Sequence, residues 1–226
     1  MVDHISQPAW LDVENFLSKT VVKADSALAE AVESAARAGM PPIEVAPTAG
    51  KFLMLLARIS GAKRVLEIGT LAGYSTIWLA RGIPADGTVI SCEFLPEHAA
   101  VARQNVDRAG IGGKVEIRVG AALETLAELA ELTESAGPFD LIFIDADKGN
   151  NVNYLRRALE LSRPGTVVVV DNVVWEGAFL APEASGDALA IRETLEFLGS
   201  SESFDATAIA TANSKGWDGF AVAVVQ

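Results

Sequence analysis

The chain has 226 residues, half of them hydrophobic, which is enough for the core of one large α/β domain. With 30 acidic against 18 basic residues, the formal net charge is −12, so a phosphate backbone would be repelled and no nucleic-acid partner is expected. The length and composition lead us to expect a single domain over 1–226. No apolar run approaches the roughly 18 residues that span a bilayer, so no membrane partner is expected. The first residues lack a signal-peptide profile and Cys92 is the one cysteine, so we expect a cytoplasmic location.

The first 60 residues are expected to be helical. Apolar residues recur at helical spacing over 10–21, and Asp25 or Ser26 can cap a second, alanine-rich helix. A Met-Pro-Pro break separates this helix from a third one over about 48–60. The segment 1–60 is expected either to cover a site or to form a subunit contact, and the sequence leaves both open.

From residue 63 onward, strand-like runs alternate with helical ones, which indicates an open, doubly wound parallel sheet. The expected strands are 64–68, 88–93, 115–119, 139–144 and 166–170. The expected helices are 75–81, 96–109, 122–134, 151–161 and 187–198. Two β-rich runs follow, 205–211 and 219–225, and the gap between them is too short for a crossover helix. We therefore expect an antiparallel hairpin at the end of the chain.

A glycine-containing loop, Gly69–Gly73, follows the first expected strand and precedes a helix. Its backbone can approach a ligand closely, and the amides of the helix N-terminus face that ligand. Leu71 stands where the dinucleotide fingerprint has its second glycine, which argues against a nicotinamide enzyme. Glu67 would repel a phosphate but suits a cofactor with an ammonium and a sulfonium, and Glu93 at the next strand end can accept hydrogen bonds from ribose hydroxyls. The loop favours S-adenosylmethionine, although its glycines could also simply turn the chain.

Polar side chains follow two of the expected strands where each strand ends. Asp145, Asp147 and Lys148 follow the fourth, and Asp171 and Asn172 follow the fifth. Taken singly, such residues are commonly helix caps or loop starts. If the two strands are parallel neighbours, two carboxylates, an amide oxygen and an amine meet at one edge, which suits a Mg²⁺-like ion with Lys148 as a base beside it. Asp147 would share a face with Asp145 if the strand persisted that far.

The runs VLEIGTLAGYS, FDLIFIDADKGNNVNY and VVVVDNVVW closely resemble the cation-dependent O-methyltransferases of the catechol and caffeoyl-coenzyme A type. The match covers about 45–175, and the terminal hairpin with Trp217-Asp218-Gly219 is similar too. The resemblance implies a Rossmann-like sheet of seven strands, six parallel and one antiparallel. It also implies S-adenosylmethionine and a divalent cation, which we expect to be Mg²⁺. The N-terminal helices resemble segments that help to build a dimer or cover the substrate, and we expect a homodimer.

The resemblance also implies individual roles. Asp145, Asp171 and Asn172 fall on the metal ligands, and Lys148 falls on the catalytic lysine. The cofactor-contacting positions are Val45, Glu67, Gly69, Thr70, Ser75, Glu93, Ala122 and Asp147. Trp175 corresponds to an aromatic residue that walls the substrate pocket, where Asp145 and Lys148 also contact the acceptor.

Two departures bear on the acceptor. The catechol-specific enzymes have an acidic residue shortly before the last strand, where this chain has Asn213-Ser214-Lys215-Gly216, and the acyl-carrier enzymes have an asparagine where this chain has Glu176. We therefore expect a small vicinal-diol aromatic or related phenol, methylated at a hydroxyl. The alternatives are a non-oxygen acceptor and a non-catalytic S-adenosylmethionine-binding protein. His4 and His98 are expected at the surface, and Trp217 is expected near the pocket.

Overall fold

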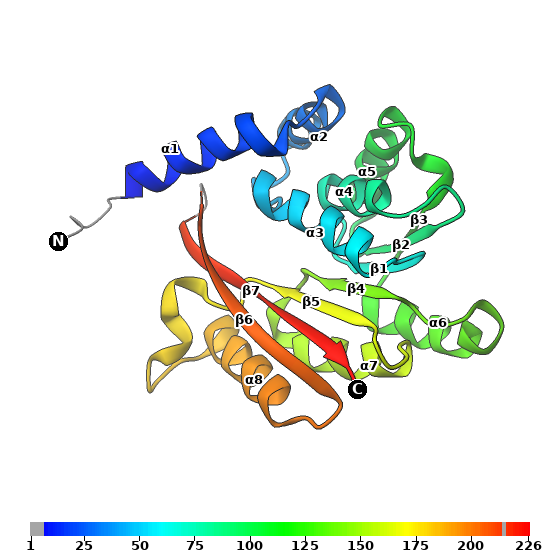
Figure 1. Cartoon of the computed structure of the whole chain (residues 1–226), viewed down its shortest axis with the longest axis vertical. Coiled ribbons are helices and arrows are strands. Elements are labelled where there is room, and N and C mark those ends of the chain that lie inside the picture. Colours follow the sequence, from blue (N-terminus) through cyan, green and yellow to red (C-terminus); the bar gives the residue numbers. More distant parts are fainter. Residues whose placement is uncertain (1–6, 214–215) are drawn as a thin grey trace.

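Over residues 7–213 and 216–226, which the computed structural model describes, seven strands form one sheet in the order β3-β2-β1-β4-β5-β7-β6 (Figure 1). The strands are β1 (Arg64–Ile68), β2 (Thr88–Glu93), β3 (Val115–Val119), β4 (Leu141–Ile144), β5 (Val167–Asp171), β6 (Phe204–Asn213) and β7 (Gly216–Val225). Every pairing from β3 to β5 is parallel, and β7 is antiparallel to both β5 and β6. The predicted doubly wound sheet with a terminal antiparallel hairpin is confirmed.

The α-helices are α1 (Gln7–Leu17), α2 (Ser26–Arg37), α3 (Pro47–Ile59), α4 (Tyr74–Gly82), α5 (Pro96–Arg108), α6 (Ala122–Ala136), α7 (Asn151–Glu160) and α8 (Gly186–Ser200). Shorter elements are the π-helix η1 (Ser18–Val22) and the 3₁₀ segments η2 (Gly112–Lys114), η3 (Lys148–Asn150) and η4 (Trp175–Leu180). Asp25 caps α2 as predicted, since its side chain accepts a hydrogen bond from the Leu28 N–H at 3.2 Å. His4 lies outside the described residues.

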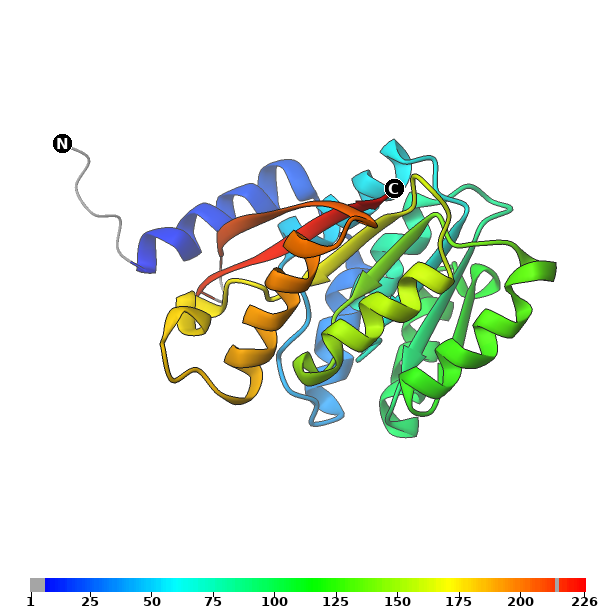
Figure 2. The ribbon, with the colours of Figure 1, turned by 90° about the horizontal axis from the view of Figure 1, so that it is seen from below.

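The helices cover both faces of the sheet, as Figure 2 shows. Alternate strand residues point to opposite faces, so Val65 packs with α2, α3 and α4 on one side while Leu66 packs with α6, α7 and α8 on the other. All four residues of β4 are buried because both faces of this strand are covered. This explains why the central strands read as continuous apolar runs in the sequence.

Strand order reverses between β1 and β4. The chain runs outward from β1 through β2 to β3, then returns to place β4 and β5 on the other side of β1. Helices leave β1 and β4 toward opposite faces of the sheet, which leaves a crevice at their carboxyl ends. The predicted site residues follow these strand ends, so the topology brings them to one edge.

Helix α1 extends beside the β6–β7 hairpin (Figures 1 and 2) and contacts β6. The hairpin strands are longer than predicted, so Trp217 and Asp218 belong to β7 instead of the turn. Within the described ranges no helix combines the length and apolar character that a membrane crossing requires. The cytoplasmic location stays a prediction.

Candidate active site

A cavity of about 840 Å³ opens at the carboxyl ends of the central strands, in the crevice between β1 and β4. Most of the predicted site residues line it: Val45, Gly69, Thr70, Ser75, Glu93, Ala122, Asp145, Asp147, Lys148, Asn172 and Trp175. Glu67 and Asp171 are the predicted residues outside this lining set. The volume is in the upper part of the range for small-molecule sites, so two small reactants can share the cavity.

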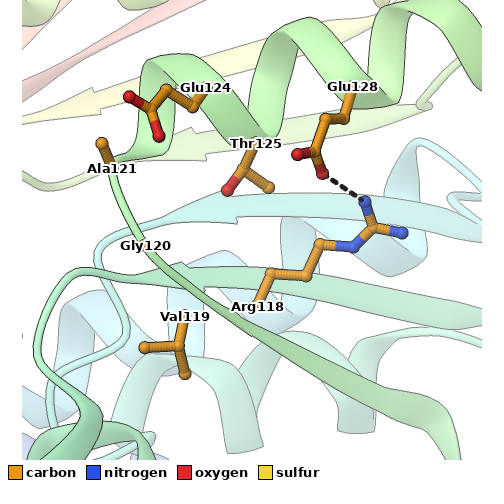
Figure 3. Close-up of a pocket in the computed structure, with 7 residues that line it drawn as sticks. All are labelled: Arg118, Val119, Gly120, Ala121, Glu124, Thr125 and Glu128. Atoms are coloured by element: carbon orange, nitrogen blue, oxygen red, sulfur yellow. Dashed lines mark ion pairs between the residues drawn. The ribbon is translucent and has the colours of Figure 1, made fainter.

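A second, smaller hollow of about 290 Å³ lies nearby, beyond the end of β3 (Figure 3). Figure 3 shows Glu124 and Glu128 from α6 above it and Arg118 from β3 below, with Arg118 Nη1 4.0 Å from Glu128 Oε2. Gly120 and Ala121 line both spaces. None of the residues with a predicted role lines this hollow, so the larger cavity is the candidate active site.

The loop after β1 reaches the cavity because of its glycines. Gly69 has a φ of 99°, and a Cβ at this position would lie 1.9 Å from the carbonyl oxygen of Asp145. Only a residue without a side chain allows the β1 loop to lie this close to the residue that follows β4. Gly69 therefore sets the spacing between the predicted cofactor loop and the first predicted metal ligand.

Glu67 lies behind the cavity wall and is fully buried. Its carboxylate accepts hydrogen bonds from the hydroxyls of Ser75 (2.6 Å), Ser91 (2.6 Å) and Thr76 (2.5 Å). Burial raises the pKa of Glu67 to about 7, while the three hydroxyl donors oppose that rise. In this structure Glu67 reaches the cavity through Ser75, which lines it, and the predicted contact with the cofactor stays a prediction.

Glu93 stands at the end of β2 and faces the loop after β1. Its Oε2 accepts hydrogen bonds from the backbone N–H groups of Thr70 (3.2 Å) and Leu71 (2.8 Å), and its Oε1 accepts one from Leu95 (3.0 Å). His98 Nδ1 lies 3.5 Å from Glu93 Oε1. The expectation that His98 is a surface residue is wrong, because its side chain is 18% exposed and lines the cavity.

Asp147 does not extend the strand, because β4 ends at Ile144 and the argument from strand alternation fails. The Asp147 carboxylate instead accepts hydrogen bonds from the Tyr154 hydroxyl (2.5 Å) and the Asn150 amide (2.6 Å). Burial and the Asp147 charge raise the pKa of Tyr154, which keeps this hydroxyl a donor. Sequence reasoning missed Tyr154, which lies one helical turn into α7 and lines the cavity.

Lys148 is buried against Asp145. Its Nζ lies 3.0 Å from Asp145 Oδ1, and only 7% of the residue is exposed. Asp171, at the end of the neighbouring strand β5, has its pKa raised by burial and by the Asp145 carboxylate, while Lys148 acts in the opposite direction. The parallel pairing of β4 with β5 thus brings the two carboxylates and the amine together as predicted.

Asn172 follows directly and begins a loop with left-handed backbone. Asn172, Trp175, Glu176 and Gly177 have φ values of 57°, 43°, 53° and 76°. A bulky aromatic residue rarely adopts such a φ, so the surroundings of Trp175 must hold it there. Asp218 on β7 does so in part, since it accepts hydrogen bonds from the Trp175 N–H (2.9 Å) and from Asn172 Nδ2 (2.8 Å).

The residues at the two strand ends fit a divalent cation. Asp145, Asp171 and Asn172 offer carboxylate and amide oxygens, the hard donors that Mg²⁺ prefers. Burial raises the pKa of Asp171 most, and repulsion by the Asp145 carboxylate raises it further; a cation would relieve this repulsion. Among the described residues no group of three or more His, Cys, Asp or Glu side chains could hold a metal ion. The set of Asp145, Asp171 and Asn172 is not such a group, because its third member is an asparagine amide.

Comparison with known proteins identifies the family of this chain. The family model described as O-methyltransferase matches residues 18–205. The chain is 52% identical to a catechol O-methyltransferase of Mycobacterium tuberculosis, over 97% of this chain and 98% of that one. It is 47% identical to a catechol O-methyltransferase of Niastella koreensis, over 95% and 96% of the two chains.

A solved structure gives the same result for the fold. The O-methyltransferase from Bacillus cereus, in complex with SAH, is 45% identical to this chain with a TM-score of 0.94, over 98% of this chain and all of that one. The two proteins therefore share the same fold over nearly their whole length. On the match of its sequence to the family model and to these relatives, the chain belongs to the O-methyltransferase family.

Proposed function

We propose that this protein transfers the methyl group of S-adenosylmethionine to a hydroxyl of a small catechol-like or phenolic acceptor, with a divalent cation in the site. The observation that carries the proposal is that Lys148, Asp145 and Asn172 line the same cavity as the loop after β1. A candidate base, oxygen ligands and a cofactor loop therefore face one space. The two catechol O-methyltransferases, and the Bacillus cereus relative in complex with SAH, support the acceptor and the cofactor.

The cofactor would occupy the part of the cavity between the β1 loop and β2. Glu93 is fixed there by three backbone N–H groups, so its carboxylate is held in place to meet ribose hydroxyls. Val45, Ala122 and Asp147 line the same cavity and would provide further cofactor contacts. These contacts are proposed from the positions that match the family motifs.

The cation would be held by Asp145, Asp171 and Asn172, next to the side of the cavity walled by Trp175. When bound, it lowers the pKa of a coordinated acceptor hydroxyl. Mg²⁺ is the ion we expect, because all three protein ligands are oxygens. An acceptor with two adjacent hydroxyls suits such a site better than an isolated amine, which favours oxygen methylation over the alternative of a nitrogen acceptor.

Lys148, as a neutral amine, would take the acceptor proton and become an ammonium. Asp145 holds the amine at 3.0 Å, and burial of Lys148 keeps this amine away from bulk water. The acceptor oxygen then attacks the sulfonium methyl in line, and the C–S bond breaks to leave SAH. Most of the rate gain would come from holding the two reactants in this geometry.

Methyl transfer from labelled S-adenosylmethionine to a panel of catechols, caffeate esters, flavonoids and aromatic amines tests the proposal. We expect turnover of a catechol with Mg²⁺, its loss in EDTA and its return when Mg²⁺ is restored. Turnover that persists in EDTA would refute the cation's role. Cofactor binding by calorimetry without turnover of any compound would favour the non-catalytic alternative, and transfer confined to amines would refute the hydroxyl acceptor.

We also propose that the protein is a homodimer. Apolar side chains lie exposed on the N-terminal helical segment and on the neighbouring hairpin, with Phe16 66% exposed, Val21 61% exposed, Trp217 44% exposed and Ile209 43% exposed. Adjacent apolar patches of this kind are typical of subunit contacts. Light scattering of the purified protein should give the mass of two chains, and Phe16→Glu should give one. A wild-type mass of one chain would refute the dimer.

A further inference from the structure

Asp218 on β7 makes an unusual number of contacts with the loop that follows β5. Its Oδ1 accepts hydrogen bonds from the backbone N–H groups of Val174 (3.3 Å), Trp175 (2.9 Å) and Gly219 (2.8 Å). Its Oδ2 accepts one from Nδ2 of Asn172 at 2.8 Å. One carboxylate therefore ties the hairpin both to the backbone of the left-handed loop and to the side chain of a proposed metal ligand.

The two carboxylate oxygens of Asp218 bind different groups. Three N–H donors converge on Oδ1, so the carboxylate of Asp218 cannot rotate without losing backbone bonds. Oδ2 is thereby presented to Asn172 in a fixed direction. A carboxylate only accepts hydrogen bonds, so the group of Asn172 that faces it must be the NH₂.

This contact decides which atom of Asn172 is left for a cation. The amide nitrogen and oxygen lie on opposite sides of the side-chain carbon, so when Nδ2 points to Asp218, Oδ1 points away from it. The oxygen carries the lone pairs that a hard cation needs, whereas the amide nitrogen is a donor. With the amide reversed, Asn172 would present N–H groups to the site.

We propose that Asp218 is a positioning residue that fixes the amide orientation of Asn172 so that its oxygen faces the divalent cation. This inference rests on the cation of the proposed function. Groups that orient metal ligands in this way change metal affinity by about 10- to 100-fold when they are removed. Asp218 itself is not proposed as a ligand.

The Asp218→Asn variant separates orientation from anchoring. Its amide oxygen alone can accept the three backbone N–H bonds, so the new NH₂ must take the place of Oδ2 and face Asn172. Two donors would then oppose each other, and Asn172 must reverse its amide to bond. The loop stays anchored, while the wrong atom of Asn172 faces the cation site.

Mn²⁺ is the probe, titrated into the full-length protein without acceptor and followed by the electron paramagnetic resonance of free Mn²⁺. We expect Asp218→Asn to weaken Mn²⁺ binding by about tenfold or more, with an unfolding temperature near that of the wild type. Adding Asn172→Asp to this variant should restore the affinity, because a carboxylate can accept a hydrogen bond from the introduced NH₂ on one oxygen and bind the ion with the other. Asp187→Asn, on the wall of the same cavity, measures the loss from removing one negative charge, and we expect it to be below about threefold.

Four other outcomes would contradict the proposed role of Asp218 or the cation on which it depends. Binding of Mn²⁺ by Asp218→Asn within about twofold of wild type would show that the amide orientation does not matter. A loss in Asp187→Asn as large as that in Asp218→Asn would assign the effect to charge. Failure of Asn172→Asp to restore binding would remove the coupling, and this double variant also supplies the comparison if Asp218→Asn alone folds poorly. A wild-type protein that binds no Mn²⁺ would refute the cation in the proposed function itself.

Discussion

Replacement of Gly69 by alanine should disrupt both the fold and the site. Gly69 has a φ of 99°, a backbone conformation that L-residues rarely adopt, and a Cβ there would lie 1.9 Å from the Asp145 carbonyl oxygen and 2.8 Å from its carbonyl carbon. The obstacle is backbone, not the end of a flexible side chain. The β1 loop and the residue after β4 must therefore separate.

The structure gives the size of the effect. The left-handed backbone alone costs a residue with a Cβ about 1–2 kcal/mol. Bringing the Cβ–oxygen contact to 3.0 Å needs a movement of more than an ångström, which strains the hydrogen bond of 2.8 Å from Asp145 N–H to the Ile68 carbonyl. With that bond weakened and the strand ends displaced, we expect a total loss of about 3–5 kcal/mol in the free energy of unfolding.

Gly39→Ala is the matched control, since Gly39 also has a positive φ (71°) but a Cβ there would meet nothing within 4 Å. Urea unfolding of the wild type and the two variants measures the difference, and calorimetry with S-adenosylmethionine measures the site. We expect Gly39→Ala to lose only the backbone cost and to bind the cofactor as the wild type does. If the two variants were equally stable, the argument from close backbone approach would be wrong.

Three further predictions concern the charged groups of the site. Lys148→Met should leave the protein folded and able to bind cofactor, while turnover falls by about 10²- to 10⁴-fold. The control Lys63→Met, at an exposed lysine paired with Asp86, should leave turnover unchanged. Equal turnover rates in the two variants would remove Lys148 from the mechanism. Asp171→Ala should abolish Mg²⁺-dependent transfer and spare cofactor affinity in calorimetry, and activity without metal would contradict the cation site. Burial raises the pKa of Glu67 from 4.5 to about 7, so the folded state holds a proton that the unfolded state releases, and stability should fall by about 3 kcal/mol as pH rises through that window. Glu67→Gln should remove this contribution and so reduce the slope in urea unfolding at pH 5 and 7, while the contribution of Asp171 remains. An unchanged slope would refute the assignment.

The sequence correctly predicted which residues lie at this edge of the sheet because most of them stand where an apolar run ends. Asp145 follows β4 and Asp171 is the last residue of the neighbouring strand β5, and the carboxyl ends of such parallel strands meet at one edge of the sheet. Gly69 was found from its place between a strand and a helix. Motifs of this kind are local, so they can be recognised in the sequence without knowing which elements pack against them.

The positions that the sequence did not predict depend on contacts made just past a strand end with the helix that follows. His98 was assigned to the surface because it stands at the start of a helix beside Glu97, yet the first turn of α5 places it beside Glu93. Asp147 lines the cavity, but strand alternation, which required the strand to persist that far, does not place it there, because its hydrogen bond to Tyr154 forms beyond the end of β4. In both cases the side chain is positioned by the first turns of a helix, where strand periodicity gives no information.

By itself, the sequence determined the alternation of strands and helices, the antiparallel end of the sheet and the oxygen donors at the strand ends. The spacing of apolar residues and the polar residues that follow a strand can both be recognised within a short segment. The tertiary structure alone decided that Glu67 is enclosed by three hydroxyls from other segments and that Asp218 faces Asn172 across a separation of 46 residues. Such contacts follow from the register of β7 against β5 and from how tightly the helices close over the sheet. Register and packing are properties of the whole chain, because each depends on all the surfaces buried together.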